Sequence, residues 1–152
     1  LRIFGLFGPG EDYRLRFISN MMVRILLDKK LEMNQDAYFD YVYIKDFCRI
    51  VAHFIEHTGK YRAYNIGTGK RHRLSGIAKK IIAMTDAAST LHIKQSGLNR
   101  EYTCDNTRLM KELKGFQFTD INESLKELWE WYKNRKLTLD PRVRGDDKPQ
   151  FL

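Results

Sequence analysis

The sequence predicts an α/β fold in which short strands alternate with amphipathic helices and pair mostly in parallel. The first observation is the alternation itself. Aromatic and β-branched runs of strand length, such as residues 38–44, precede segments with apolar residues at helical spacing, such as residues 46–59. The second is composition, because 43% of the 152 residues are hydrophobic, which is enough for a core in a chain of one domain's length. A disordered chain is therefore excluded.

Hydrophobic periodicity and turn residues predict the secondary-structure elements of the first half of the chain. They are, in order, a buried strand at residues 1–7, a turn at 8–10, a helix within 13–29, a strand at 38–44 and a helix over 46–59. Asp46 is expected to cap the last helix and Gly59 to end it. The apolar strand at 1–7 should leave an open edge unless neighbouring strands cover it.

The second half continues the same alternation. Its predicted elements are a strand at 61–66, a loop at 67–69, a helix over 75–84, a strand at 91–95, a short helix over 105–113 and a last helix from 120 to 136. Asp105 and Asp120 are the expected caps, and Glu123 completes a capping-box pattern with Asp120. Residues 1–136 form the predicted folded part, and the aperiodic tail at 137–152 is expected to be disordered.

The net charge and the cysteine content indicate which partners and which cellular compartment to expect. The formal charge of +8 favours an anionic partner, whether nucleic acid, an acidic surface or a phosphate-bearing ligand. No apolar run is long enough to span a bilayer and no secretory leader is present, so no membrane partner is expected. Cys48 and Cys104 form no Cys-x-x-Cys pair. We therefore expect reduced thiols and a cytoplasmic protein. Because the predicted strand begins at Leu1, we also expect the numbering to start inside a longer polypeptide.

Three motifs suggest chemistry that their context does not support. His53 and His57 match the zinc pattern His-x-x-Glu-His, but basic residues share their helix face and no third ligand stands out, so no metal is expected. Tyr41 and Lys45 match Tyr-x-x-x-Lys, yet on a strand they would lie about 13 Å apart. Tyr132 and Lys136 have helical spacing, but they lie at the end of the last helix with Tyr132 on its apolar stripe.

The basic segment Lys70-Arg-His-Arg73 leaves two interpretations open. It follows the Gly67-Thr-Gly69 loop and precedes a helix, where backbone N–H groups and cations could bind a phosphate. It could equally be a turn with solvated basic side chains. Most aromatic residues lie on core stripes rather than among the basic ones, so nucleic-acid binding is not expected.

Three ordered motifs together resemble a known family. They are Arg2-Ile-Phe-Gly-Leu-Phe-Gly-Pro-Gly-Glu11, Phe39-Asp-Tyr-Val-Tyr-Ile-Lys-Asp46 and Tyr64-Asn-Ile-Gly-Thr-Gly69. In this order and spacing, the segment 1–136 resembles the C-terminal half of NAD-dependent nucleotide-sugar epimerases/dehydratases, which are extended short-chain dehydrogenases/reductases. The resemblance implies the end of a Rossmann sheet plus a smaller α/β substrate-binding domain.

The resemblance also implies what these residues lack. The family's N-terminal Rossmann portion, with its dinucleotide-binding glycines and catalytic Tyr-x-x-x-Lys, is absent from them. We therefore expect no catalytic residue in this chain and no activity from it alone. NAD or NADP would be the cofactor of the full-length enzyme, and neither should bind tightly to this chain.

The family's binding roles carry over at a few positions only. The backbone around Ile3 and Phe4 would meet the nicotinamide carboxamide. Substrate-binding positions are Gly5, Phe39, Tyr41 and Arg100. Many relatives have a diphosphate-binding Asn at the position of Gly5 and a phosphate-binding Arg at that of Phe39, so both departures remove a polar contact. Arg100 lies near a second phosphate-binding Arg of the family, and its guanidinium suits a diphosphate.

The predicted function is therefore to bind the nucleotide-sugar substrate of an epimerase/dehydratase, either as a homo-oligomer or docked to a Rossmann half. The alternative is a non-enzymatic basic module that binds an anionic partner such as nucleic acid, or that docks onto another polypeptide.

Overall fold

The computed structural model describes residues 1–135, so Lys136 and the predicted tail at 137–152 lie outside the described residues. The predicted α/β class and mostly parallel pairing are confirmed. Three strand pairs are parallel: β1 (Arg2–Ile3) with β6 (Asn65–Ile66), β2 (Leu6–Phe7) with β5 (Val42–Tyr43), and β3 (Leu31–Asp36) with β8 (Leu91–Leu98). The pair of β4 (Tyr38–Phe39) with β7 (His72–Arg73) is antiparallel.

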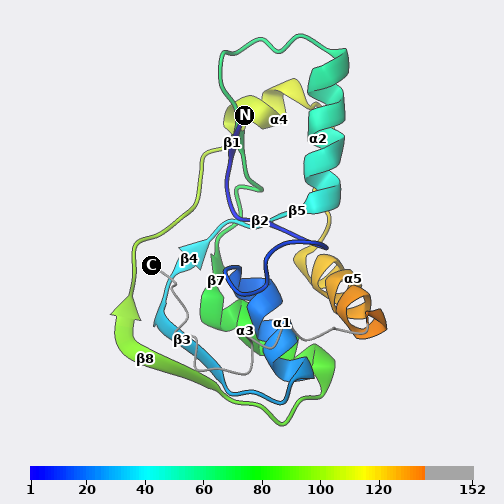
Figure 1. Ribbon diagram of the computed structural model, residues 1–152. Coiled ribbons are helices and arrows are strands. Elements are labelled where there is room, and N and C mark those ends of the chain that lie inside the picture. Colours follow the sequence, from blue (N-terminus) through cyan, green and yellow to red (C-terminus); the bar gives the residue numbers. More distant parts are fainter. Residues whose placement is uncertain (136–152) are drawn as a thin grey trace.

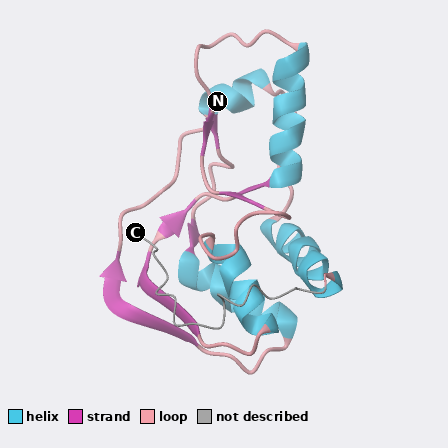
Figure 2. Cartoon of the chain, viewed as in Figure 1, coloured by secondary structure: helices cyan, strands magenta, loops and turns pink. Residues whose placement is uncertain are grey.

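The helices form two groups around these strands. They are α1 (Phe17–Leu26), α2 (Ile44–Glu56), α3 (Leu74–Thr85), α4 (Thr107–Glu112) and α5 (Ile121–Asn134). Figures 1 and 2 show α2 rising from the end of β5 beside β1, β6 and α4, while α1, α3 and α5 pack together at the other end of the molecule. In the described part of the chain, no helix is both long and apolar enough to cross a membrane.

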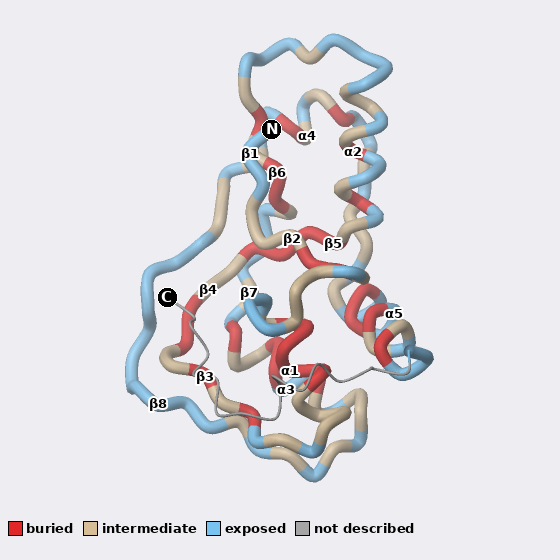
Figure 3. The backbone as a smooth tube through the Cα atoms, in the orientation of Figure 1, coloured by how far each residue is buried: buried red, intermediate tan, exposed pale blue. Residues whose placement is uncertain are grey.

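The core consists of two apolar clusters that correspond to these helix groups. The larger one lies between α1, α3 and α5 and contains Ile18, Met21, Ile77 and Leu128 among its fully buried members. The smaller one lies between α2, α4 and β6. Figure 3 shows the buried backbone concentrated at these two places and along β2 and β5, whereas β8 runs exposed along one side.

Two predicted strands are each divided into two shorter ones. Residues 1–7 give β1 and β2, which separate at Gly5, and residues 38–44 give β4 and β5, which separate at Asp40. Both breaks lie at the point where the two segments come together. There Val42 N donates to Gly5 O at 3.1 Å, and the parallel pairing of β2 with β5 begins. The prediction of a buried first strand is wrong at its start, since Ile3 is 43% exposed and β1 pairs only with β6 among the described residues.

The sequence analysis did not predict β3, and it misplaced two helix caps, because the N-cap of α4 is Asn106 rather than Asp105. Four of the six side chains in Leu31–Asp36 are polar. The two apolar ones, Leu31 and Met33, alternate along the strand and are buried in the core. Asp46 lies in the first turn of α2 rather than at its N-cap, which is Tyr43. Asp120 is an N-cap as predicted, because its carboxylate accepts the Asn122 N–H at 2.8 Å.

Two buried carboxylates accept hydrogen bonds from the segments at which helices α3 and α5 begin. Asp46, 1% exposed, accepts from Thr119 N at 2.8 Å and Thr119 Oγ1 at 2.9 Å, which fixes the segment leading into α5. Asp36, 2% exposed, accepts from Ser75 N at 3.0 Å and Ser75 Oγ at 2.6 Å at the start of α3. These charged acceptors fix the two segments on which the candidate site is built.

Candidate functional site

A third buried carboxylate organises the centre of the molecule. Asp40 is fully buried, and its two oxygens accept Thr68 N at 2.8 Å, Thr68 Oγ1 at 2.5 Å and Gly69 N at 2.8 Å. The Gly67-Thr-Gly69 loop is therefore held by the carboxylate of the middle sequence motif, and its N–H groups are already occupied. These backbone donors are not available to a phosphate, contrary to one of the two interpretations of this loop.

Gly5 packs directly against the backbone of the same motif. A Cβ at this position would lie 2.1 Å from Asp40 O and 3.1 Å from Tyr41 Cδ1. No side chain fits here unless the backbone moves, since real Cβ contacts do not approach that closely. Gly5 can therefore meet a ligand only through its backbone.

Aromatic side chains from the predicted site join into one continuous row. Phe4 contacts Tyr102 with a ring-centroid distance of 5.0 Å, and Tyr102 contacts Phe39 at 5.5 Å. Phe39 stacks on Tyr41 at 5.8 Å with 21° between the planes, and Tyr41 meets Phe7 edge-on at 5.8 Å. Three predicted site residues, Phe4, Phe39 and Tyr41, are thus brought together although they come from two separate motifs.

The predicted site residues did not include two members of this row, the buried Phe7 and the more exposed Tyr102. Tyr102 is 45% exposed, and it is held against β4 because Tyr102 N donates to Tyr38 O at 2.8 Å. Its only sequence signal is its place two residues after Arg100. The Arg100 side chain is exposed, and its guanidinium has no ion pair within the described residues. Ile3 lies on the exposed strand β1 and does not join the row.

The basic segment divides between two roles. Arg71 pairs with Glu101 at 2.6 Å and lies over the Tyr38 ring at 4.4 Å, and Arg73 pairs with buried Asp36 at 2.6 Å. Lys70 and His72 instead line a cavity between the 67–69 loop and the first turn of α5. The structure thus splits the basic segment: two cations have carboxylate partners, and two side chains face the cavity.

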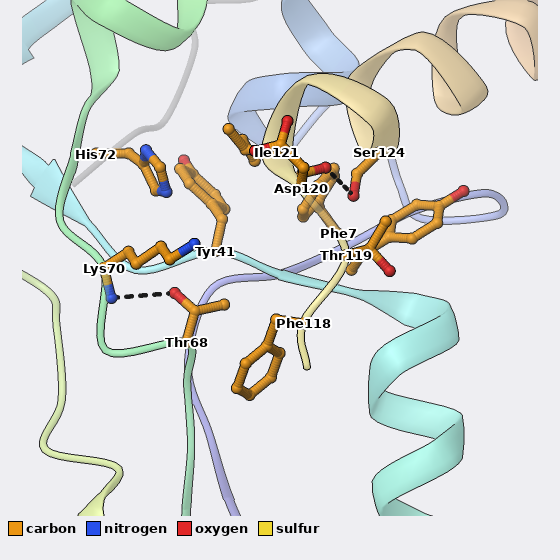
Figure 4. A pocket seen from close by; sticks show the side chains of 11 residues that line it. Phe7, Tyr41, Thr68, Lys70, His72, Phe118, Thr119, Asp120, Ile121 and Ser124 are labelled. Atoms are coloured by element: carbon orange, nitrogen blue, oxygen red, sulfur yellow. Dashed lines mark hydrogen bonds between the residues drawn. The ribbon is translucent and has the colours of Figure 1, made fainter. Parts of the chain in front are cut away.

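Figure 4 shows this cavity with Tyr41, Lys70 and His72 on one side and Asp120, Ile121 and Ser124 on the other. Burial lowers the pKa of His72, so its imidazole favours the neutral form. Burial, together with the charge of Glu11, raises the pKa of Tyr41 above its ordinary value, so its phenol remains protonated and acts as a hydrogen-bond donor.

The histidine pair, the Tyr41–Lys45 pattern and Cys104 can be followed within the described residues. The His53 and His57 rings stack at 4.5 Å, and within residues 1–135 no group of three metal-binding side chains could hold an ion. Lys45 pairs with Glu127 at 2.6 Å rather than with Tyr41. Burial and the neighbouring Asp40 raise the pKa of the Cys104 thiol to about 12, which makes it a poor nucleophile at neutral pH.

Comparison with known proteins agrees with the sequence resemblance. Residues 1–67 match the model of the NAD dependent epimerase/dehydratase family. The family resemblance is thereby confirmed for this segment. The matched segment includes β1, β2, β5 and the positions of Gly5, Phe39 and Tyr41. No curated protein matches the chain in sequence.

Solved structures extend the likeness of fold to most of the described chain. An NAD-dependent NDP-hexosamine 5,6-dehydratase of tunicamycin biosynthesis matches with a TM-score of 0.77 and 21% identity, covering 90% of this chain and 45% of that one. The dTDP-glucose 4,6-dehydratase of Bacillus anthracis, in complex with NAD, gives a TM-score of 0.75 and 20% identity, covering 92% and 46%.

A third match is the UDP-N-acetylglucosamine 4-epimerase of Methanobrevibacter ruminantium in complex with UDP-N-acetylmuramic acid. It gives a TM-score of 0.71 and 19% identity, covering 87% of this chain and 44% of that one. The chain therefore has a partial extended short-chain dehydrogenase fold and spans less than half the length of these structures.

Proposed function

We propose that this chain is the substrate-binding portion of an NAD(P)-dependent nucleotide-sugar epimerase/dehydratase. The observation that carries the proposal is the match of fold over 92% of the chain to one such enzyme, joined to the family match over residues 1–67, which include Phe4, Phe39 and Tyr41 of the aromatic row. Two of the matched structures are bound to NAD or to a UDP-sugar derivative.

The geometry supports different binding roles for the aromatic side chains and for Arg100. The row of Phe4, Tyr102 and Phe39 offers ring faces on which a nucleobase or a sugar ring could stack, each contact contributing roughly 0.5–1.5 kcal/mol. Arg100, two residues before Tyr102, supplies a guanidinium that has no ion pair within residues 1–135 and that is suited to a diphosphate. The aromatic side chains would then hold the neutral parts of the ligand and Arg100 its charge.

The reaction itself requires groups outside this set. Epimerases and dehydratases of the family oxidise a sugar hydroxyl, with a tyrosine removing the proton and the nicotinamide accepting hydride. Lys45, which matches the lysine of this pair in sequence after Tyr41, is instead paired with Glu127 at 2.6 Å. NAD or NADP would bind through the Rossmann portion of the full enzyme, with Ile3 and Phe4 contributing backbone contacts at most.

Calorimetric titration with UDP-glucose, UDP-N-acetylglucosamine and dTDP-glucose tests the binding proposal. We expect at least one nucleotide sugar to bind, and Arg100→Gln to weaken it by about tenfold through loss of a charge-assisted hydrogen bond. Arg62→Gln, an exposed position in the loop after α2, is the matched control for net charge. Absence of binding across the panel, or equal losses in both variants, contradicts the proposal.

The redox half of the proposal is tested on the polypeptide as the cell makes it. A Tyr-x-x-x-Lys pair encoded roughly two dozen codons upstream of Leu1, after a glycine-rich βα turn, would supply the missing groups. We then expect nucleotide-sugar turnover with NAD or NADP by that longer polypeptide and none by residues 1–152 alone. Turnover by residues 1–152 alone would show that the catalytic groups have been assigned to the wrong half.

A further inference from the structure

Tyr102 is an exposed aromatic residue whose position is fixed from two directions. Its backbone is hydrogen-bonded to the two residues that flank Phe39, because Tyr102 N donates to Tyr38 O at 2.8 Å and Asp40 N donates to Tyr102 O at 3.0 Å. Its ring lies against Phe4 at a centroid distance of 5.0 Å and against Phe39 at 5.5 Å. Tyr102 nevertheless remains 45% exposed. A ring that is fixed before a ligand arrives loses little conformational freedom on binding.

The polar side chains next to this ring are already engaged with one another. Thr103 Oγ1 donates to Glu101 Oε1 at 2.5 Å, and the other oxygen of Glu101 accepts from Arg71 at 2.6 Å. The hydroxyl groups of a sugar stacked on Tyr102 would compete with these contacts. The face of a nucleobase needs no hydrogen-bond partner, and its polar edge can stay in water beside an exposed ring. The surroundings of Tyr102 therefore favour a base over a sugar.

The groups available for phosphate are fewer than those available for a base. Glu101 and Arg71 neutralise each other, and the N–H groups of the 67–69 loop are occupied by Asp40. Arg100, two residues before Tyr102, is exposed and has no ion pair within residues 1–135. The site thus offers a fixed ring for a base and a single cation for the phosphate groups.

We infer that Tyr102 is the residue that binds the base of the ligand, and that it does so by stacking, independently of the phosphate groups. The inference rests on the proposed function, because it assigns one part of the nucleotide sugar to one ring of the aromatic row. Phe4 and Phe39 hold that ring in place, and Arg100 binds phosphate. Nucleosides that carry no phosphate should therefore bind at the same place.

Calorimetric titration of the full chain with parts of the ligand tests this assignment. The probes are UDP-glucose and dTDP-glucose, their nucleosides uridine and thymidine, and glucose 1-phosphate. Tyr102→Ala should weaken a nucleoside and the matching nucleotide sugar by the same factor, at least about fivefold for the loss of one base–ring stack. It should leave the binding of glucose 1-phosphate unchanged. Tyr102→Phe keeps the ring face and should bind as the unmodified chain does.

Two further variants separate stacking on Tyr102 from other effects. Tyr61→Ala removes a tyrosine of similar exposure, 40%, from the loop after α2, and it should leave all binding unchanged. Arg100→Gln should weaken the nucleotide sugars by about tenfold and leave the nucleosides unchanged, because only the former carry phosphate. Circular dichroism of each variant separates loss of the site from loss of the fold.

The results distinguish failure of this inference from failure of the proposed function. If a nucleotide sugar binds while both nucleosides do not, the inference is wrong and the proposed function stands. The same conclusion follows if Tyr102→Ala weakens no ligand, or weakens glucose 1-phosphate as much as the nucleotide sugars. If no probe binds at all, the proposed function fails together with the inference. Equal losses in Tyr102→Ala and Tyr61→Ala also contradict the assignment of the base to Tyr102.

Discussion

Replacing Asp40 by Asn should destabilise the chain strongly although the two side chains have nearly the same shape. The carboxylate is fully buried and accepts three hydrogen bonds from Thr68 and Gly69. The amide oxygen of Asn can keep the two on one side, but its NH2 group then faces the Gly69 N–H. Losing one hydrogen bond to a charged group and leaving a buried donor unmet costs about 3 kcal/mol.

Urea unfolding followed by circular dichroism measures this loss. With a slope of about 1–3 kcal/mol per molar urea, the midpoint should fall by roughly 1–3 M. The matched control is Asp12→Asn, which disturbs an exposed ion pair with Arg14 at 2.9 Å and should cost less than about 1 kcal/mol. A loss for Asp40→Asn no larger than for the control would refute the view that this carboxylate holds the 67–69 loop.

Four further substitutions change the stability of the chain in different directions or only over part of the pH range. Gly5→Ala should cost more than about 2 kcal/mol because its Cβ would meet Asp40 O at 2.1 Å, whereas Gly76→Ala, with its nearest neighbour at 3.8 Å inside α3, should stabilise by up to about 1 kcal/mol in thermal unfolding. Burial raises the pKa of Glu11 from 4.5 to about 7, so folding favours its protonated form. Stability should decline as pH rises between those two values, and Glu11→Gln should remove the decline in urea titrations at about pH 5 and pH 8. Ser75→Ala removes the hydroxyl that donates to Asp36 at 2.6 Å and should lower the urea midpoint by an amount equal to about 1–3 kcal/mol; no change would mean that the backbone N–H of Ser75 suffices.

Periodicity predicted the helices because each of them buries one apolar stripe. The helix at Leu74–Thr85 agrees with its predicted span within a residue at each end. The strands were harder, since pairs of two residues leave almost no alternation to detect, and β3 carries mostly polar side chains because only one face of it meets the core. The breaks at Gly5 and Asp40 depend on where two distant segments cross, which local sequence does not encode.

The candidate site was predictable only in part for the same reason. The motifs identified Phe4, Phe39 and Tyr41, and the structure joins these rings. Tyr102 was missed because an isolated bridge to Phe39, rather than a motif, brings it there. Which members of the basic segment face the cavity was equally hidden, because the pairing of β7 with β4 directs neighbouring side chains to different partners.

By the resemblance, many relatives carry a polar side chain at the positions of Gly5 and Phe39, and the packing around Gly5 shows what its restoration would require. Asp40 O occupies the space that a side chain at position 5 would need, so Asn cannot be restored there unless the backbone at Asp40 moves. That backbone is fixed, because Asp40 N donates to Tyr102 O at 3.0 Å and its carboxylate holds the 67–69 loop. Phe39 meanwhile fills the position of the family's arginine with a ring that stacks on Tyr41. Under the proposed function, neither substitution alone would recover a polar clamp, and a diphosphate bound at this site would rely on Arg100 for its charge.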